Sequence, residues 1–332
     1  MVTSDAIRSW PKVELHDHLD AGLRIGTVAD IGRELGMALP EPLESALVAP
    51  DVCADLADLL ARIHLAVDVM QRPQDLARVA EEHVADLAVD GVVYGEIRFA
   101  PQLHTRRGLG LQAIVDTVAA GLRRAGERHG VETGLILCCL RHETPAESRR
   151  VAELAVANRH QVVALDLAGD EAAFPSAEPH REAFAIARDG GLHRTVHAGE
   201  NGGAACVAEA LDVLGAERIG HGARVVEDPA LVDRVTADAV ALEMCPRSNV
   251  QTRAVASLAA HPIDRLLRRG TCVTVSTDGR TTCGTTVTAE FERLGRQFGW
   301  GRAEFLTCQR NAARAAFLDD PHRLRLLGRL EA

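Results

Sequence analysis

Lysine is almost absent from this sequence. The chain has 37 basic residues, and Lys12 is its only lysine. A Schiff-base or carboxylated-lysine mechanism would have to use this residue, which precedes the segments where we expect the site. We therefore expect neither mechanism, and the same scarcity disfavours a binuclear hydrolase built on a carboxylated lysine.

Cysteine pairs and long hydrophobic runs are absent as well. The eight cysteines include no C-x-x-C pair and most stand in apolar stretches, so we expect buried free thiols. No segment approaches the ~18 consecutive apolar residues that span a bilayer. No basic stretch followed by an apolar one opens the chain, as it would in a secretory signal. We therefore expect a cytoplasmic protein with no membrane partner.

The charge balance is acidic. A net charge of −10 argues against binding to a nucleic-acid backbone, because phosphate recognition favours a basic surface. The charge says little else, and the sequence leaves the formation of a homo-oligomer open.

Short β-rich runs alternate with helical patterns along the whole chain. No low-complexity segment or Gly/Ser linker divides residues 1–332, so we expect one domain. Eight strands, each followed by a helical segment, predict the α/β class and a (β/α)8 TIM barrel. The predicted strands are Lys12–Leu19, Val92–Phe99, Gly134–Leu140, Val162–Leu167, His193–His197, Arg218–Gly220, Val240–Met244 and Thr271–Thr277.

Helical periodicity is clearest over 74–90, 111–129 and 146–159, where apolar residues recur on one face. The stretch 22–72 is too long for a single connection between a strand and a helix. We expect a helical insertion after the first strand, which would form a lid over the barrel mouth.

Residues able to bind a metal follow four of the predicted strands. His16 and His18 in ELHDHLD point to the same side of a strand, and HRTVHAGE supplies His197 with Glu200 three residues later. His221 in RIGHGAR and Asp278 in STDGR stand at two further strand ends. Taken singly, each is as well explained by a loop histidine or an Asx turn.

Together these residues indicate a catalytic metal site, because barrel enzymes carry their chemistry at this end of the strands. His16, His18, His197 and Asp278 give three nitrogen ligands and one oxygen ligand and leave room for water, as catalytic zinc requires. We expect one zinc ion per chain, although this ligand set would also suit Fe or Co. Glu200 and His221 remain as acid–base groups.

The sequence resembles the adenosine deaminase family. The resemblance begins at PKVELHDHLD (11–20) and extends past TDGR (277–280) into the following helix. Between them stand GVVYGEIRFAP (91–101), VVALDLAGDEAAFP (162–175), HRTVHAGE (193–200), ERIGHG (217–222) and LEMCPRSNVQT (242–252), in the order of the family. The resemblance implies a one-zinc barrel that hydrolyses a 6-aminopurine nucleoside, adenosine or a modified analogue, to the 6-oxo product and ammonia.

The resemblance also implies roles for single residues. Glu200, His221 and Asp278 would be the catalytic groups. Glu200 would protonate purine N1, and His221 and Asp278 would take the proton of the attacking water. Gly169 would offer its N–H to N3, and Asp20 would lie near the ribose. His18 and Gly279 would complete the substrate-binding set.

Gly279 departs from the family pattern. The family usually has a second Asp here, or an Asn in one bacterial group, that reaches purine N7. Ala21 likewise replaces a usual glycine, and Ile63 stands where an aromatic residue commonly lines the lid. We expect unchanged chemistry with altered recognition near N7, through a modified substrate, a water molecule or Arg280. The alternative is that this subgroup simply tolerates glycine.

Other functions remain open at this point. The same residues would serve a deaminase of free adenine or of N6-substituted adenine, although Asp20 favours a ribosyl substrate. A non-catalytic purine-binding protein belongs to a different class, and it would not need a proton donor beside a metal. The cytidine-type zinc deaminases are excluded, because they need a P-C-x-x-C motif.

Overall fold

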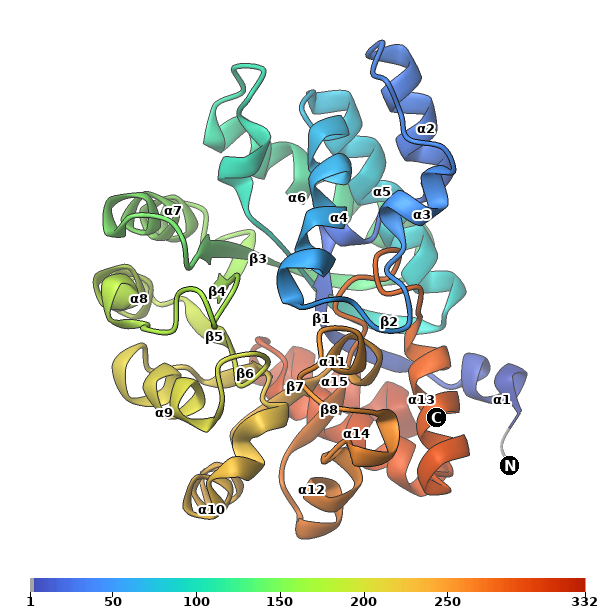
Figure 1. Ribbon diagram of the computed structural model, residues 1–332, viewed down its shortest axis with the longest axis vertical. Coiled ribbons are helices and arrows are strands. Elements are labelled where there is room, and N and C mark those ends of the chain that lie inside the picture. The colour runs from blue at the N-terminus through green and yellow to red at the C-terminus, as the bar shows by residue number, and fades with distance from the viewer. Residues whose placement is uncertain (1–2, 332) are drawn as a thin grey trace.

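The computed structural model describes residues 3–331. Its eight parallel strands are paired in chain order, β1 to β8, with helices around them (Figure 1). The strands are β1 Lys12–His18, β2 Val92–Phe99, β3 Glu132–Leu140, β4 Val162–Ala168, β5 His193–Ala198, β6 Arg218–His221, β7 Ala241–Met244 and β8 Val273–Val275. The predicted (β/α)8 barrel is therefore confirmed.

Fifteen α-helices and five short 3-10 turns complete the described part of the chain. The helices are α1 Ser4–Ser9, α2 Ile25–Glu34, α3 Leu43–Leu47, α4 Leu56–Val69, α5 Pro73–Val89, α6 Leu111–His129, α7 Pro145–Ala157, α8 Arg181–Asp189, α9 Ala204–Val213, α10 Pro229–Ala237, α11 Pro246–Gln251, α12 Ile263–Arg269, α13 Val287–Phe298, α14 Arg302–Ala315 and α15 Asp320–Glu331. The turns are η1 Leu19–Ala21, η2 Pro101–His104, η3 Glu178–His180, η4 Ala223–Glu227 and η5 Leu258–Ala260.

Asp278, which the sequence predicts to be a metal ligand, links the last strand of the barrel to the first. β8 is shorter than the predicted Thr271–Thr277, and Asp278 forms an isolated parallel bridge with Asp17 of β1. The Asp278 N–H donates to the His16 carbonyl at 2.9 Å, and the His18 N–H donates to the Asp278 carbonyl at 2.7 Å. These two bonds fix the backbone of Asp278 beside both histidines of β1.

Capping residues in the sequence set the ends of several helices. Thr144 and Glu147 form a capping box at the start of α7, and Gly130 ends α6 in a left-handed conformation with φ 72°. The predicted insertion 22–72 holds α2, α3 and α4, and α4 lies in front of the strands in Figure 1.

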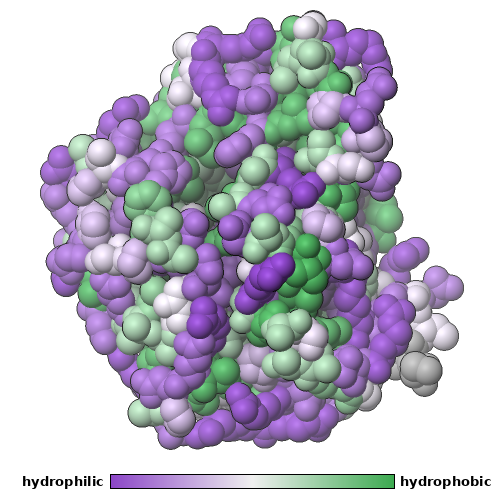
Figure 2. All heavy atoms as spheres, viewed as in Figure 1, coloured by the Kyte–Doolittle hydropathy of each residue, from purple (hydrophilic) through white to green (hydrophobic). Residues whose placement is uncertain are grey.

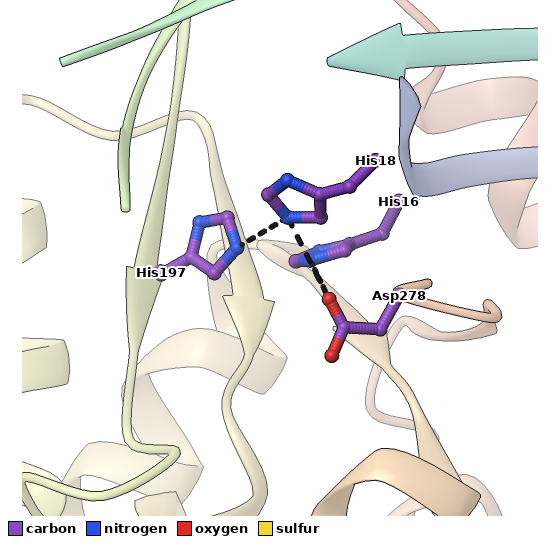
Figure 3. A group of neighbouring side chains, drawn as sticks. All are labelled: His16, His18, His197 and Asp278. Atoms are coloured by element: carbon purple, nitrogen blue, oxygen red, sulfur yellow. Dashed lines mark hydrogen bonds and ion pairs between the residues drawn. The ribbon is translucent and has the colours of Figure 1, made fainter. Parts of the chain in front are cut away.

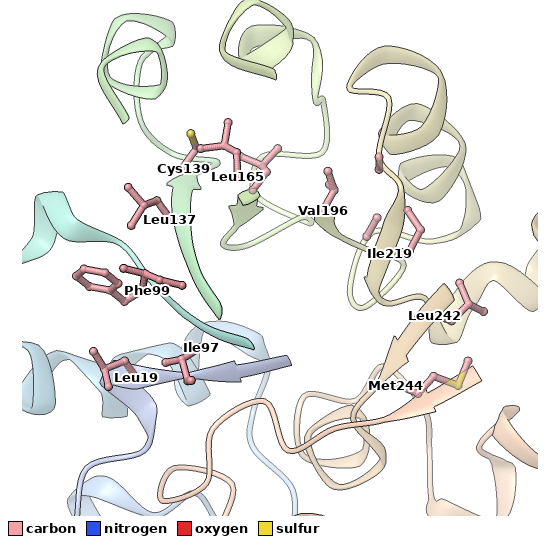
Figure 4. Close-up of a cluster of buried hydrophobic side chains, with 14 of the residues drawn as sticks. Leu19, Ile97, Phe99, Leu137, Cys139, Leu165, Val196, Ile219, Leu242 and Met244 are labelled. Carbon is pink, nitrogen blue, oxygen red and sulfur yellow. The ribbon is translucent and has the colours of Figure 1, made fainter. Parts of the chain in front are cut away.

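The hydrophobic core lies between the strands and the surrounding helices. Ile97, Phe99, Leu137, Leu165 and Val196 are all buried on the outer side of their strands (Figure 4). Hydrophilic side chains cover most of the outline of the molecule (Figure 2). The eight cysteines are free and seven are buried, as predicted. Within residues 3–331, no helix has the length and apolar character needed to cross a bilayer.

The interior of the barrel is charged. Arg98 and Arg218 are almost wholly buried and pair with the carboxylates of Glu96, Asp166 and Glu243. Residues i and i+2 of a strand share a face, so the outward Ile97 and Phe99 of β2 alternate with the inward Glu96 and Arg98. The metal-type residues at the strand ends stand above this charged layer.

Candidate active site

Three imidazoles and one carboxylate converge at the carboxyl ends of β1, β5 and β8 (Figure 3). One ligand atom from each of His16, His18, His197 and Asp278 lies within 4.8 Å of the others. His18 Nε2 is 3.1 Å from His197 Nε2, and Asp278 Oδ1 is 3.5 Å from His16 Nε2 and 3.6 Å from His18 Nε2. The four residues named from the sequence therefore meet, although 262 positions separate the first from the last.

Hydrogen bonds on the far side of two rings decide which nitrogen faces the cluster. His16 Nδ1 lies 2.9 Å from Glu243 Oε2, and His197 Nδ1 lies 3.0 Å from Asp166 Oδ2. A carboxylate only accepts, so each Nδ1 carries the proton and each Nε2 directs a lone pair into the cluster. Burial also lowers the pKa of His18 and of His197, which keeps both rings neutral.

This arrangement fits a metal cation. His16 Nε2 is buried and has no hydrogen-bond partner among the described residues. The carboxylate of Asp278 points at the same place, with Oδ1 near the Nε2 atoms of both His16 and His18. Lone pairs and a carboxylate that face one another repel unless a cation lies between them. The four residues form a candidate metal site with the donor set of catalytic zinc.

Two strained residues aim side chains at this point. His221 and Asp278 have φ values of 62° and 66°, in the left-handed region that non-glycine residues rarely adopt. Ser248 Oγ donates to Asp278 Oδ2 at 2.6 Å. The Asn249 amide lies 3.0 Å from His221 Nδ1, so α11 fixes both side chains.

Glu200 lies beside His221 and Asp278, and these three residues form a second cluster of adjacent groups. His221 Nε2 is 3.5 Å from Glu200 Oε2. Burial, followed by the nearby carboxylates Asp278 and Glu171, holds the pKa of Glu200 well above its ordinary value. Glu200 can therefore carry a proton near neutral pH, as a general acid must.

The loop that carries Glu200 is held by two residues that the sequence reasoning missed. Glu171 Oε2 accepts the N–H groups of Glu200, Asn201 and Gly202 at 3.0, 2.9 and 2.7 Å. Arg141 lies with Nη2 3.7 Å from Glu171 Oε1 and donates to the His197 carbonyl at 2.9 Å. Glu171 stands in the quoted stretch DLAGDEAAFP, but its role depends on contacts across two loops.

Asp166, Glu243 and Arg98 were also missed. Arg98 bridges the two carboxylates that hold His197 and His16, at 2.9 Å to Asp166 Oδ2 and 2.8 Å to Glu243 Oε2. Such partners orient a metal-binding histidine and fix its tautomer. In the sequence, the only sign of these three residues is that each is a charged residue within an otherwise mostly apolar strand segment.

A cavity of about 350 Å³ opens over the cluster. Each predicted substrate-binding residue lines it, namely His18, Asp20, Gly169 and Gly279, as do Glu200, His221 and Asp278. Leu56, Leu59, Leu60, Ile63 and Val67 of α4 add an apolar side. Arg280, expected as an alternative contact for N7, does not line the cavity and instead donates to the Asp86 carbonyl at 3.3 Å.

Comparisons with known proteins agree with this geometry. A family model described as adenosine deaminase matches residues 11–332. The adenosine deaminase of Mycobacterium ulcerans is 43% identical over 350 residues, which cover 98% of this chain and 96% of the relative. The crystal structure of an adenine deaminase from Arthrobacter aurescens has 32% identity and a TM-score of 0.91, with 97% and 98% of the two chains covered. An amidohydrolase from Burkholderia ambifaria with bound Zn shares the fold at 23% identity and a TM-score of 0.91, covering 100% of this chain and 93% of that one.

Proposed function

The chain belongs to the adenosine deaminase family of hydrolases, which act on carbon–nitrogen bonds of cyclic amidines, and from this premise we propose zinc-dependent deamination of a 6-aminopurine nucleoside. Water replaces the 6-amino group, giving the 6-oxopurine and ammonia. One observation carries the proposal: Glu200, whose raised pKa favours its protonated form, and His221 line one cavity together with His18, His197 and Asp278 of the candidate metal site.

In this proposal the cluster of His16, His18, His197 and Asp278 holds one zinc ion per chain. The bound ion would supply Lewis acidity that makes water ionisable near neutral pH. Glu243 and Asp166 keep the inward nitrogens of His16 and His197 free of protons, and Ser248 leaves Asp278 one free oxygen to direct at the cluster.

Glu200, His221 and Asp278, the second cluster described above, would carry out the proton transfers. Glu200 donates its proton to purine N1, so that the ring accepts electrons as the oxygen adds to C6. His221 and Asp278 take one proton of the attacking water, and this proton leaves with the amino group as ammonia. The second water proton passes from the new C6 hydroxyl to Glu200 as the 6-oxo group forms, which restores the acid. Placing a general acid in this way typically contributes 10²–10⁴ in rate.

Substrate recognition is proposed for the cavity walls. The Gly169 N–H would meet purine N3, with φ 112° at a position that favours glycine, and Asp20 would lie at the ribose hydroxyls. His18 and Gly279 complete the wall near C6. The segment 22–72 would act as a lid on the single barrel domain, because α4 supplies the apolar side of the cavity.

Free adenine is the second candidate substrate. The adenine deaminase from Arthrobacter aurescens, at 32% identity over 97% of this chain, supports it. N6-substituted adenine and non-catalytic purine binding stay as the further alternatives. The buried Asp20 in the cavity wall favours the nucleoside.

A substrate panel tests the proposal. Zinc-loaded protein is incubated with adenosine, modified adenosines, adenine and N6-substituted adenines, and ammonia release is followed for each. We expect the nucleosides to show the highest kcat/KM and Glu200→Gln to lose turnover. Release from adenine alone would move the assignment to the second candidate, and purine binding without ammonia release would leave only the binding protein.

A further inference from the structure

We infer that Ala21 and Gly279 act as one steric pair that leaves no side chain at position 279 to hydrogen-bond a ligand at the cavity wall next to Asp278. The inference rests on the proposed function for its substrate, but its steric part does not. Both residues line the cavity, one at the end of η1 and the other directly after Asp278. They are two of the positions at which the sequence departs from its family.

The space beside Gly279 is taken by the methyl group of Ala21. A Cβ atom built on Gly279 would lie 2.6 Å from Ala21 Cβ, 3.4 Å from the Ala21 carbonyl oxygen and 3.5 Å from Thr282 Cβ. Gly279 is not among the residues with positive φ, so its backbone conformation would accept any residue. Only the Ala21 methyl excludes a side chain at this position.

The two segments cannot separate easily to relieve such a contact. The Ala21 carbonyl accepts the N–H groups of Thr281 and Thr282, both at 3.0 Å. The Gly279 carbonyl accepts a hydrogen bond from the Cys283 N–H at 2.7 Å, and the Gly279 N–H donates to the Thr277 carbonyl at 2.9 Å. Immediately upstream, Asp278 is bonded to the backbone of β1. Moving Gly279 away from Ala21 would therefore disturb the candidate metal site.

This packing sets the chemistry of the wall. The Gly279 N–H is occupied, Ala21 offers a methyl group, and Arg280 turns away from the cavity. Among residues 3–331, Thr282 is the only cavity-lining residue that carries a hydroxyl group. In the proposed complex, C6 lies at the candidate metal site and N1 lies at Glu200. The ring atom on the other side of C6 is C5, which is bonded to N7, so the N7 edge of the purine faces away from Glu200. We assign this wall to that edge, to which neither Ala21 nor Gly279 would offer a hydrogen bond.

The substrate class follows from this wall. An enzyme that makes no strong hydrogen bond to N7 should accept 6-aminopurine nucleosides and their 7-deaza counterparts, in which a C–H replaces N7, with similar affinity. A site built around a polar side chain at 279 would reject the 7-deaza compounds, because its buried polar group would be left unpaired.

The steric part is tested by thermal unfolding, which needs no substrate. Gly279→Ala should lower the melting temperature by about 2 °C or more, since overpacking a filled site is destabilising. In an Ala21→Gly background the same change should have no effect beyond error. Gly26→Ala is the control for an added methyl group without overpacking, because a Cβ at Gly26 meets no described atom within 4 Å; since Gly26 lies in α2, this change should leave the melting temperature unchanged or raise it. Equal melting temperatures for Gly279→Ala and wild type would overturn the steric pair.

The recognition part is tested with inosine and 7-deazainosine as product inhibitors, so that ring reactivity does not enter. We expect their inhibition constants to agree within about threefold in the wild type. In Ala21→Gly/Gly279→Asn, whose side-chain NH2 group can donate to N7, inosine should gain about tenfold over its 7-deaza analogue. A tenfold preference for inosine in the wild type would overturn this part. If neither compound inhibits, this part falls together with the proposed function, while the melting data still decide the steric pair.

Discussion

Replacing Asp166 by asparagine should weaken metal binding, although Asp166 is not one of the four candidate metal ligands. The carboxylate is fully buried on β4 and accepts from His197 Nδ1 at 3.0 Å and from Arg98 Nη1 at 2.9 Å. Burial alone would raise the pKa of Asp166, but His197 and Arg98 hold it below its usual range. The group is therefore an anion that both neighbours need.

Asparagine has almost the same shape but only one acceptor oxygen. Its NH2 group must face one of the two donors. If it faces His197 Nδ1, that nitrogen gives up its proton, which moves to Nε2 and blocks the ligand lone pair. Loss of such a partner typically costs 10–100-fold in metal affinity, or about 1.4–2.7 kcal/mol. The apoprotein should also lose stability, by at most about 3–5 kcal/mol, because Arg98 keeps Glu243 as a partner.

Zinc competition against a chromogenic chelator measures the affinity, and urea unfolding of the apoprotein measures the stability. Asp212→Asn is the matched control, since Asp212 is an exposed carboxylate paired with Arg234 at 2.6 Å. We expect the control to match wild type in both measurements. Zinc affinity of Asp166→Asn within twofold of wild type, with only stability reduced, would refute the claim that Asp166 sets the His197 tautomer.

Three further predictions concern the acid, the metal and the buried histidine of η2. Glu200→Gln should lower kcat/KM by about 10²–10⁴-fold while the zinc content stays at the wild-type value. The exposed control Glu182→Gln should change neither quantity. Full activity of Glu200→Gln would exclude Glu200 as the general acid. Removing the metal by chelation should abolish ammonia release, and zinc at a thousand times its Kd should raise the free energy of unfolding by about 4 kcal/mol; turnover that survives chelation would argue against the metal. Burial lowers the pKa of His104 from 6.5 to about 4, against the opposing effect of its hydrogen bond to the Met70 carbonyl. Between these two pH values the unfolded chain binds more protons than the folded chain. Stability is therefore lost as the pH falls through 6.5. The wild type should therefore lose about 2 kcal/mol more than His104→Gln between pH 7 and pH 5 in urea unfolding, and parallel losses would contradict this.

The strands were predictable because each is a short apolar run bounded by turn residues, and β2 was found with both ends correct. The end of β8 was not, because residues 276–278 bond to β7 and β1 singly rather than as a continuous ladder. The site residues named from the sequence share a simple property: each stands at or just after the end of a strand, where a parallel barrel gathers its side chains. That rule places them together without knowledge of the partners.

The charged layer beneath the site could not be predicted in the same way. Arg98 and Glu243 are 145 positions apart, and each is tolerated in the interior only because the other is there. A sequence shows a charge inside an apolar strand but not its partner on another strand. Likewise, the sequence shows Ala21 and Gly279 as two separate departures from the family pattern, and only their three-dimensional contact shows that Ala21 occupies the space beside Gly279.

Anomalous diffraction at the zinc absorption edge, from crystals of the zinc-loaded protein, tests the central claim most directly. The account predicts one strong peak per chain, within coordination distance of nitrogen atoms of His16, His18 and His197 and of one oxygen atom of Asp278. A peak held by other residues, or no peak in crystals of protein that releases ammonia, would contradict it.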